Sequence, residues 1–193
     1  MRSIILIAAL VLGGATATMA QEEAYHGDAA ITYHWVRTNA APGECGCFSL
    51  NGGGVSGSWN FHGPWSIISD FGAETNSSVP FNQGSLTVIS LLAGARYRVP
   101  QPWIKGAHRP LPFAQALIGP AHATGAGAGV ADGTNAFAAR IGGGIDVPLK
   151  SHFQVRAIQI DWFRTQFANT VNDRQNNLEI SVGLVYHWSR TMD

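Results

Sequence analysis

The sequence predicts an all-β fold, an eight-stranded antiparallel up-and-down transmembrane β-barrel preceded by a cleavable signal peptide. Three observations predict it. Segments of about ten residues alternate between apolar and polar or small side chains, and they recur along the chain after its N-terminus. No convincing helical pattern interrupts them. The connectors between them also sort into short and long ones, as in a barrel that crosses a membrane.

Residues 1–20 have the features of a signal peptide. Arg2 supplies a positive charge, an apolar run covers residues 4–12, and small residues precede Gln21. The apolar run is too short for a membrane-spanning helix, which needs about 20 apolar residues, and no later segment comes close. We therefore expect a signal peptide at residues 1–20 and a barrel domain at residues 21–193.

The alternating segments predict eight strands. Because this number is even, the C-terminus returns to the same side of the barrel as the N-terminus. We expect strands at residues 29–38, 48–61, 64–74, 85–98, 111–122, 136–147, 153–165 and 177–188. In the seventh segment, Arg156 has the same parity as the apolar Ile158 and Ile160. Either Arg156 extends toward the membrane boundary, or a β-bulge shifts the register there.

The connectors alternate in length. Short turns at residues 62–64 and 148–151 follow the second and sixth segments, whereas the connectors after the first, third, fifth and seventh segments are longer and rich in Gly, Asn, Ser and Ala. The connector after the fourth segment, residues 100–109, is an exception because it is long. Long loops otherwise lie at one end of the barrel and short turns at the other, which is typical of extracellular loops and periplasmic turns.

The last segment indicates which face meets lipid. Leu178, Val182 and Leu184 lie on one face, and Glu179 and His187 lie on the other with small residues between them. Glycine weakens strands and is rare on a solvated sheet face, but it leaves room for long charged side chains in a narrow lumen. We therefore expect the apolar face to contact lipid and the charged face to point inward.

An eight-stranded barrel has space inside only for its own side chains, so a closed polar lumen is expected. Buried charges must be paired, and both signs are available here. The expected lumen network consists of Asp70, Glu74, Arg96, Arg140, Asp146, Asp161, Glu179 and His187. Structural ion pairing is the favoured role for this network, and proton or ion passage is the alternative.

Aromatic residues gather near the ends of the expected strands. Two girdles of aromatic rings at the membrane interfaces are typical of transmembrane barrels. The expected girdle residues are Trp35, Trp59, Phe61, Trp65, Tyr97, Trp162, Tyr186 and Trp188.

Five stretches carry a resemblance to a known family. They read GARYRV (94–99), PFAQALIG (112–119), AARIGGGIDVPL (138–149), FQVRAIQIDWFRT (153–165) and NNLEISVGLVYHW (176–188). Together they resemble the small, barrel-only members of the OmpA-like eight-stranded outer-membrane barrels of Gram-negative bacteria. The resemblance implies a location in the bacterial outer membrane, contact with its lipids, and four extracellular loops.

The resemblance also implies a structural or surface-interaction role, in which the loops meet an extracellular partner and the barrel acts as a monomer. Two alternatives stay open on sequence alone. The chain is then either a soluble exported β-barrel that binds a small apolar ligand, or a small ion-conducting channel. Nucleic acid is not expected as a partner, because twelve basic and twelve acidic residues balance and no basic stripe is visible.

Enzymatic activity is not expected. No nucleophile, base and orienting residue converge in the sequence, so we predict no catalytic residues, and no cofactor or metal site is predicted either. His26 and Asp28 are expected to form an exposed polar pair ahead of the first strand.

Two cysteines, Cys45 and Cys47, lie in the first long connector with one glycine between them. Because an exported protein meets oxidising conditions, a disulfide that stiffens this loop is favoured. Free thiols or a metal site remain the alternatives.

Overall fold

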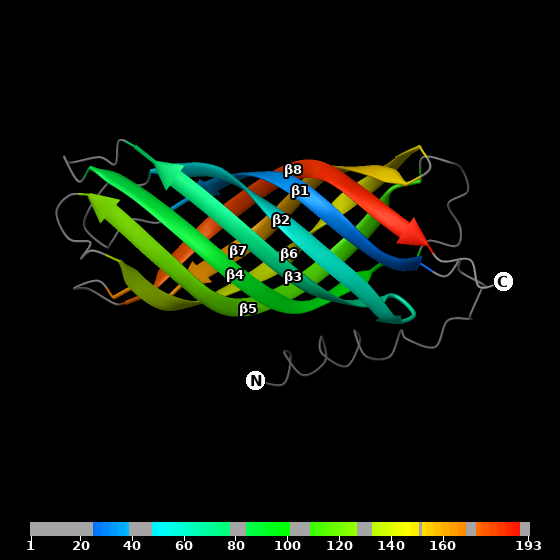
Figure 1. The fold of residues 1–193 in the computed structure, drawn as a ribbon, viewed down its shortest axis with the longest axis horizontal. Helices are drawn as coiled ribbons and strands as arrows, with labels where there is room; N and C mark the ends of the chain where they lie inside the picture. The colour runs from blue at the N-terminus through cyan, green and yellow to red at the C-terminus, as the bar shows by residue number, and fades with distance from the viewer. Residues whose placement is uncertain are drawn as a thin grey trace, which may run out of the picture.

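The computed structural model describes residues 25–38, 48–77, 84–100, 109–126, 133–150, 152–168 and 173–189. Within these residues, eight antiparallel strands form a closed barrel, and each strand pairs with its neighbours in the chain (Figure 1). The strands are β1 (Tyr25–Arg37), β2 (Ser49–His62), β3 (Trp65–Asn76), β4 (Ser85–Arg98), β5 (Leu111–Ala126), β6 (Thr134–Lys150), β7 (Phe153–Thr165) and β8 (Gln175–Ser189). This architecture confirms the predicted fold class. No helix in the described part of the chain is long and apolar enough to cross a membrane.

The barrel closes between its first and last strands. β1 and β8 pair from Tyr25 opposite Ser189 to Arg37 opposite Leu178, so both strands have complementary neighbours on each side. Closure removes the exposed strand edges that would otherwise leave backbone groups unpaired in lipid. The start of β1 and the end of β8 therefore lie at one end of the barrel, which we call the terminal end. The opposite end is the loop end.

Alternation of side chains sets the two faces of the wall. In β3, Trp65, Ile67 and Phe71 are exposed, whereas Asp70 and Glu74 are buried. Large apolar side chains cover the outer face of every strand, and Ile31 is the most exposed of them at 69%. A soluble protein does not leave so much contiguous apolar surface in water. The predicted orientation, with the apolar face outward, is confirmed.

β7 carries a β-bulge that explains the parity of Arg156. The register with β8 shifts between Arg156 and Gln159, so the two consecutive residues Ala157 and Ile158 are both exposed on the outer face. The extra residue turns Arg156 into the lumen, where it is 1% exposed. Of the two alternatives for this residue, the bulge is therefore the one observed.

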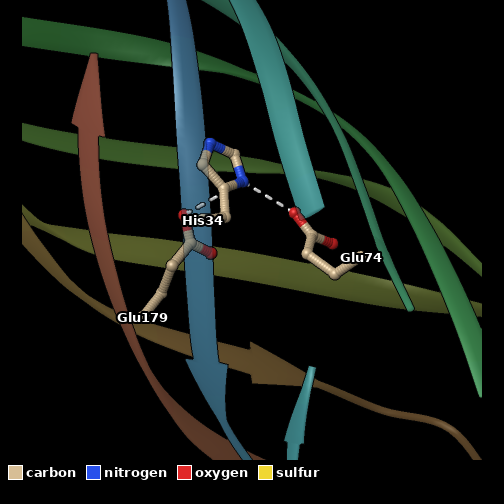
Figure 2. A group of neighbouring side chains, drawn as sticks. All are labelled: His34, Glu74 and Glu179. Atoms are coloured by element: carbon tan, nitrogen blue, oxygen red, sulfur yellow. Dashed lines mark hydrogen bonds and ion pairs between the residues drawn. The ribbon is translucent and has the colours of Figure 1, made fainter. Parts of the chain in front are cut away.

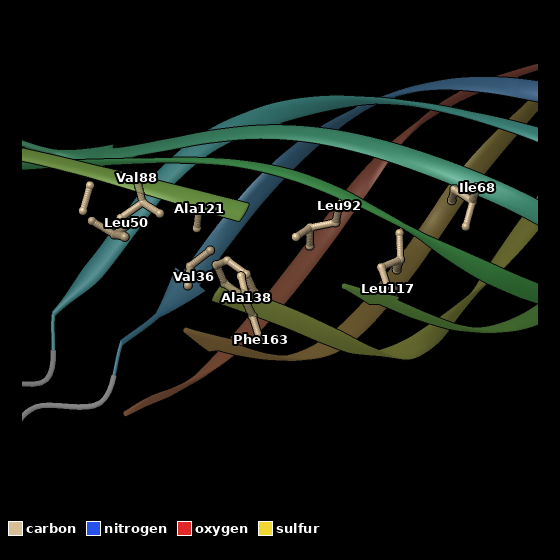
Figure 3. Packing of buried hydrophobic residues seen from close by; sticks show 10 residues of the cluster. Val36, Leu50, Ile68, Val88, Leu92, Leu117, Ala121, Ala138 and Phe163 are labelled. Atoms are coloured by element: carbon tan, nitrogen blue, oxygen red, sulfur yellow. The ribbon is translucent and has the colours of Figure 1, made fainter. Parts of the chain in front are cut away.

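The interior contains apolar side chains as well as charges. At the loop end, aliphatic and aromatic residues from six strands fill the lumen, and Leu92, Leu117 and Ile68 continue the cluster toward the terminal end (Figure 3). We call the loop-end group the apolar plug; it consists of Val36, Leu50, Val88, Ala121, Ala138 and Phe163. The expectation of a wholly polar lumen was therefore too simple, because inward positions near the loop end are apolar or alanine.

Candidate functional site

Buried and partly buried charges from six of the strands, β1, β3, β4, β6, β7 and β8, meet inside the barrel. They form two groups, one nearer each end. The terminal-side cluster contains Asp28, Arg96, Arg98, Asp146 and Arg156, and the loop-side cluster contains His34, Asp70, Glu74, Arg140 and Glu179. Charged side chains are almost never fully buried unless they are paired, so this arrangement dominates the interior.

In the terminal-side cluster, each carboxylate contacts more than one guanidinium. Asp28 receives Nη1 of Arg96 at 3.3 Å and Nη2 of Arg98 at 3.0 Å. Asp146 accepts two hydrogen bonds from Arg156, from Nε at 2.9 Å and from Nη2 at 3.2 Å. Bidentate contacts of this kind fix the orientation of the guanidinium group as well as its position. Strands β1, β4, β6 and β7 are thereby tied together across the lumen.

Phe113 of β5 contacts two of these guanidinium groups. The Cζ atoms of Arg96 and Arg156 are each 4.6 Å from the centroid of its ring. Gln115, two residues further along β5, accepts hydrogen bonds from Arg96 at 2.9 and 3.2 Å. Ring faces attract cations, so the phenyl group stabilises both buried positive charges.

The loop-side cluster is organised around Arg140 of β6. Its Nη1 donates to Asp70 of β3 at 2.5 Å, and its Nη2 lies 3.0 Å from Glu179 of β8. Nδ1 of His34 lies 2.7 Å from Oε1 of Glu74 and 3.7 Å from Oε1 of Glu179 (Figure 2). Residues from four strands therefore converge at one level of the lumen, directly beneath the apolar plug.

Glycines provide the space for this cluster. A Cβ atom on Gly54 would lie 2.7 Å from Cε1 of His34, and one on Gly72 would lie 2.8 Å from Oε1 of Glu74. Real Cβ atoms do not approach other atoms so closely. The glycines at these inward positions therefore allow the imidazole and the carboxylate to cross the narrow lumen.

The apolar plug closes the lumen above the charges. Val36 follows His34 by two residues in β1, and Phe163 follows Asp161 in the same way in β7. The guanidinium of Arg140 lies 4.9 Å from the ring of Phe163, which joins the two layers. None of the six side chains of the apolar plug carries a charged group that could bind an ion entering from the loop end.

Comparison with known proteins gives a family. A family described as "Outer membrane protein beta-barrel domain" matches residues 6–187. The chain belongs to this family. The outer-membrane barrel is thus placed in the bacterial outer membrane, and the alternative of a soluble ligand-binding barrel is wrong, because its apolar face would point inward.

Solved structures support the same fold for this outer-membrane barrel. It is similar to Neisserial surface protein A, with 12% sequence identity and a TM-score of 0.64 over 84% of this chain and 97% of that one. It is also similar to Ail, the attachment invasion locus protein of Yersinia pestis, with 14% identity and a TM-score of 0.50 over 83% and 99% of the two chains. A comparison with curated protein sequences gave no match.

Seven of the residues expected in the lumen network lie inside the outer-membrane barrel and are buried. They are Asp70, Glu74, Arg96, Arg140, Asp146, Asp161 and Glu179. Asp161 accepts hydrogen bonds from Gln159 at 2.5 Å and from Gln115 at 3.5 Å. His187 is only partly buried at the terminal end, where Gln154 lies 3.3 Å from its Nδ1 and the ring of His152 lies 5.8 Å away.

The sequence did not identify four further members of the two clusters: Asp28, His34, Arg98 and Arg156. Asp28 was expected to be exposed, and this was wrong: it lies within β1 and is 1% exposed. No large apolar residue lies between Tyr25 and Ile31, so alternation did not extend the strand back to Asp28. His34 had the correct parity, but parity alone does not reveal a partner.

The expected girdle residues lie near the two ends of the strands. Around the terminal end, Trp59 and Trp188 have ring centroids 6.5 Å apart, and Trp65 and Tyr97 have centroids 4.9 Å apart. Tyr186 packs edge-on against a further ring, Phe153, at 5.4 Å. Phe61 is exposed beside them, and Trp35 and Trp162 lie near the loop end. Cys45 and Cys47 fall outside the described residues, so their disulfide stays a prediction.

Proposed function

We propose that this outer-membrane barrel acts as a rigid, closed support that displays its four loops to an extracellular partner, and that it works as a monomer without catalytic activity. The observation that carries the proposal is that two layers of side chains, one charged and one apolar, close the lumen. Charge pairs fill the lumen from the terminal end to its middle, and the apolar plug fills it beyond them. In a barrel built in this way, the loops are the part that remains available to bind a partner.

Burial supports a closed lumen rather than a conducting one. Asp146, Glu179 and Val36 are each 0% exposed, although they come from three strands and belong to the terminal-side cluster, the loop-side cluster and the apolar plug. Eight-stranded barrels are wide enough only for their own side chains. An ion would have to break buried ion pairs and then cross an apolar layer, and both steps are costly.

The composition of the loops indicates the chemistry of the partner. Between the strands at the loop end, residues 38–48, 77–84, 127–133 and 166–174 contain only four charged side chains, which are Glu44, Asp132, Asp173 and Arg174. The same ranges contain six glycines, five alanines, four asparagines, three phenylalanines and three valines. We propose that the partner is recognised through apolar contacts and hydrogen bonds rather than through charge.

Cell-surface display tests this proposal. Cells that carry the full barrel are compared with cells that carry a variant whose four loop-end connectors are replaced by short turns, and adhesion of both to epithelial cells is counted. The full barrel should increase adhesion, the loop-shortened variant should not, and high salt should leave the difference largely unchanged because few charges are involved. Equal adhesion by both variants would contradict a role for the loops.

Conductance provides the matched test of closure. The purified barrel in planar bilayers should produce no discrete current steps. Steps that change when Arg140 is replaced by glutamine would instead support the channel alternative, because that residue lies at the level an ion would have to pass.

A further inference from the structure

Three side chains in the loop-side cluster have the composition of a metal-binding site. His34, Glu74 and Glu179 come from β1, β3 and β8, and one ligand atom from each lies within 4.8 Å of the others (Figure 2). All three are buried, with 2%, 1% and 0% exposure. Imidazole nitrogen and carboxylate oxygen are ligands that divalent first-row metals accept.

Carboxylate oxygens at this site lack hydrogen-bond donors. Among the described residues, Oε2 of Glu74 and both oxygens of Glu179 have no hydrogen-bond partner. Oε2 of Glu179 still lies 3.0 Å from Arg140, but its Oε1 points toward the imidazole of His34. Buried acceptors without donors cost free energy, and a bound cation would satisfy them.

The imidazole is held in an orientation that suits a ligand. Nε2 of His34 shares a hydrogen bond of 2.7 Å with the hydroxyl of Thr32, and Nδ1 faces the two glutamates. Metal-bound histidines commonly have their second nitrogen engaged in this way, which fixes the ring. Thr32 therefore occupies the place of a residue that orients a ligand.

Charge around the site favours a cation. Asp70, Glu74 and Glu179 bring three carboxylates, whereas Arg140 is the one guanidinium in the loop-side cluster. Even with a positive imidazole, this cluster carries an excess of negative charge in the protein interior. A divalent ion bound to the neutral imidazole would balance the charge of the cluster without another side chain.

We propose that His34, Glu74 and Glu179 form a binding site for one divalent first-row metal ion, with Nδ1 of the histidine and one oxygen from each glutamate as ligands. Metal to ligand distances of about 2.0–2.2 Å place tetrahedral donors about 3.4 Å apart. Nδ1 is 3.7 Å from Oε1 of Glu179, which is close to this value, and 2.7 Å from Oε1 of Glu74, so the second of these distances must widen. Sequence alone predicts no metal site, because the ligands lie on three separate strands. The site is independent of any role of the loops.

The position of the site indicates how it is filled. It lies beneath the apolar plug, and Val36 is only two residues from His34 on the same face of β1. From the loop end an ion in water would have to cross this apolar layer, and from the terminal end it would have to pass the buried ion pairs of the terminal-side cluster. We therefore expect the metal to enter while the barrel folds rather than after it has closed.

Zinc retention tests the proposal. The barrel is folded in detergent micelles with ZnCl₂ or with a chelator, passed through a desalting column, and assayed for zinc per chain by mass spectrometry. The wild-type barrel folded with zinc should retain about one equivalent and unfold at a higher temperature than the chelator-treated barrel. His34→Asn and Glu179→Gln should each lower the affinity by more than the roughly 10–100-fold that a second-shell change costs.

His122→Asn is the matched control, because His122 lies near the loop end in a hydrogen bond to Asn135 and outside the site. This variant should retain zinc. Cobalt replaces zinc in a parallel sample, and its spectrum should lack a thiolate charge-transfer band, which separates the lumen site from Cys45 and Cys47. Glu74→Gln provides a third ligand variant if another fails to fold. A folded wild-type barrel that retains no zinc, or ligand variants that retain as much as His122→Asn, would overturn the proposal.

Discussion

Replacing Val182 with arginine places a positive charge on the lipid-facing side of β8. Val182 is 45% exposed and lies on the same outer face as Leu178 and Trp188. In register it is opposite Tyr33 of β1, so the outward position is fixed by pairing with the neighbouring strand. We expect this substitution to destabilise the folded barrel in a bilayer and to leave its lumen unchanged.

The magnitude follows from the depth of the residue. Val182 is six residues from Trp188 in the terminal-end girdle, and a rise of about 3.4 Å per residue with a tilt of about 40° gives a depth of about 16 Å. The apolar band of such barrels is about 25 Å tall, so Val182 lies within a few ångströms of the midplane. Arginine there should cost about 2–4 kcal/mol.

Leu178 on the same strand is the matched control. It is ten residues from Trp188, which gives a depth of about 26 Å and places it at the far edge of the apolar band. Its register partner is Trp162, a residue of the loop-end girdle. Leu178→Arg should therefore cost only about 0–1 kcal/mol.

Reversible unfolding by denaturant in phospholipid vesicles measures both costs, with tryptophan fluorescence and the migration of unheated samples on gels as readouts. The prediction concerns the difference between the two variants in the free energy of unfolding. Equal costs at both positions would refute the assigned depth. Indifference to either charge would refute contact of this face with lipid.

Three further predictions concern the interior and the N-terminus. Arg140→Met leaves two buried carboxylates without their guanidinium and should destabilise the barrel by about 3–5 kcal/mol, whereas Arg37→Met at an exposed position should have little effect; unfolding in vesicles compares them. Gly72→Val should cost about 1–3 kcal/mol because its Cβ would lie 2.8 Å from Glu74 and 3.2 Å from Ser90, and Gly57→Ala, with nothing within 4 Å, should be tolerated in the same assay. The mass of the protein isolated from outer membranes should match a chain that begins at Gln21, and an intact N-terminus would contradict the signal peptide.

Alternation of residue types was sufficient to predict the wall of the barrel. A period of two puts successive side chains on opposite faces, so Asp70 and Glu179 could be assigned to the inner face from their apolar neighbours alone. Alternation did not predict the inward orientation of a residue where the period of two is interrupted. Arg156 precedes a bulge at Ala157 and Ile158, and a bulge leaves no reliable mark in the sequence.

The contacts inside the lumen were beyond the reach of the sequence for a geometric reason. Parity says which side chains point inward, but the stagger between strands decides the level at which each one lies. His34 and Glu179 meet because β1 and β8 close the wall in one register. A different stagger would keep every inward residue inward and give it different partners.

The ion pairs join segments that are far apart along the chain, and this has a consequence for biogenesis. Asp28 contacts Arg96 over a separation of 68 residues, and Asp70 contacts Arg140 over 70. Contacts of such long range form late and slowly. Because Glu179 on the final strand supplies the second carboxylate of Arg140, that guanidinium is fully matched only after the last strand has joined the first. A wall with a strand missing or shifted would therefore carry mismatched buried charges, and we expect it to unfold more readily than a complete one.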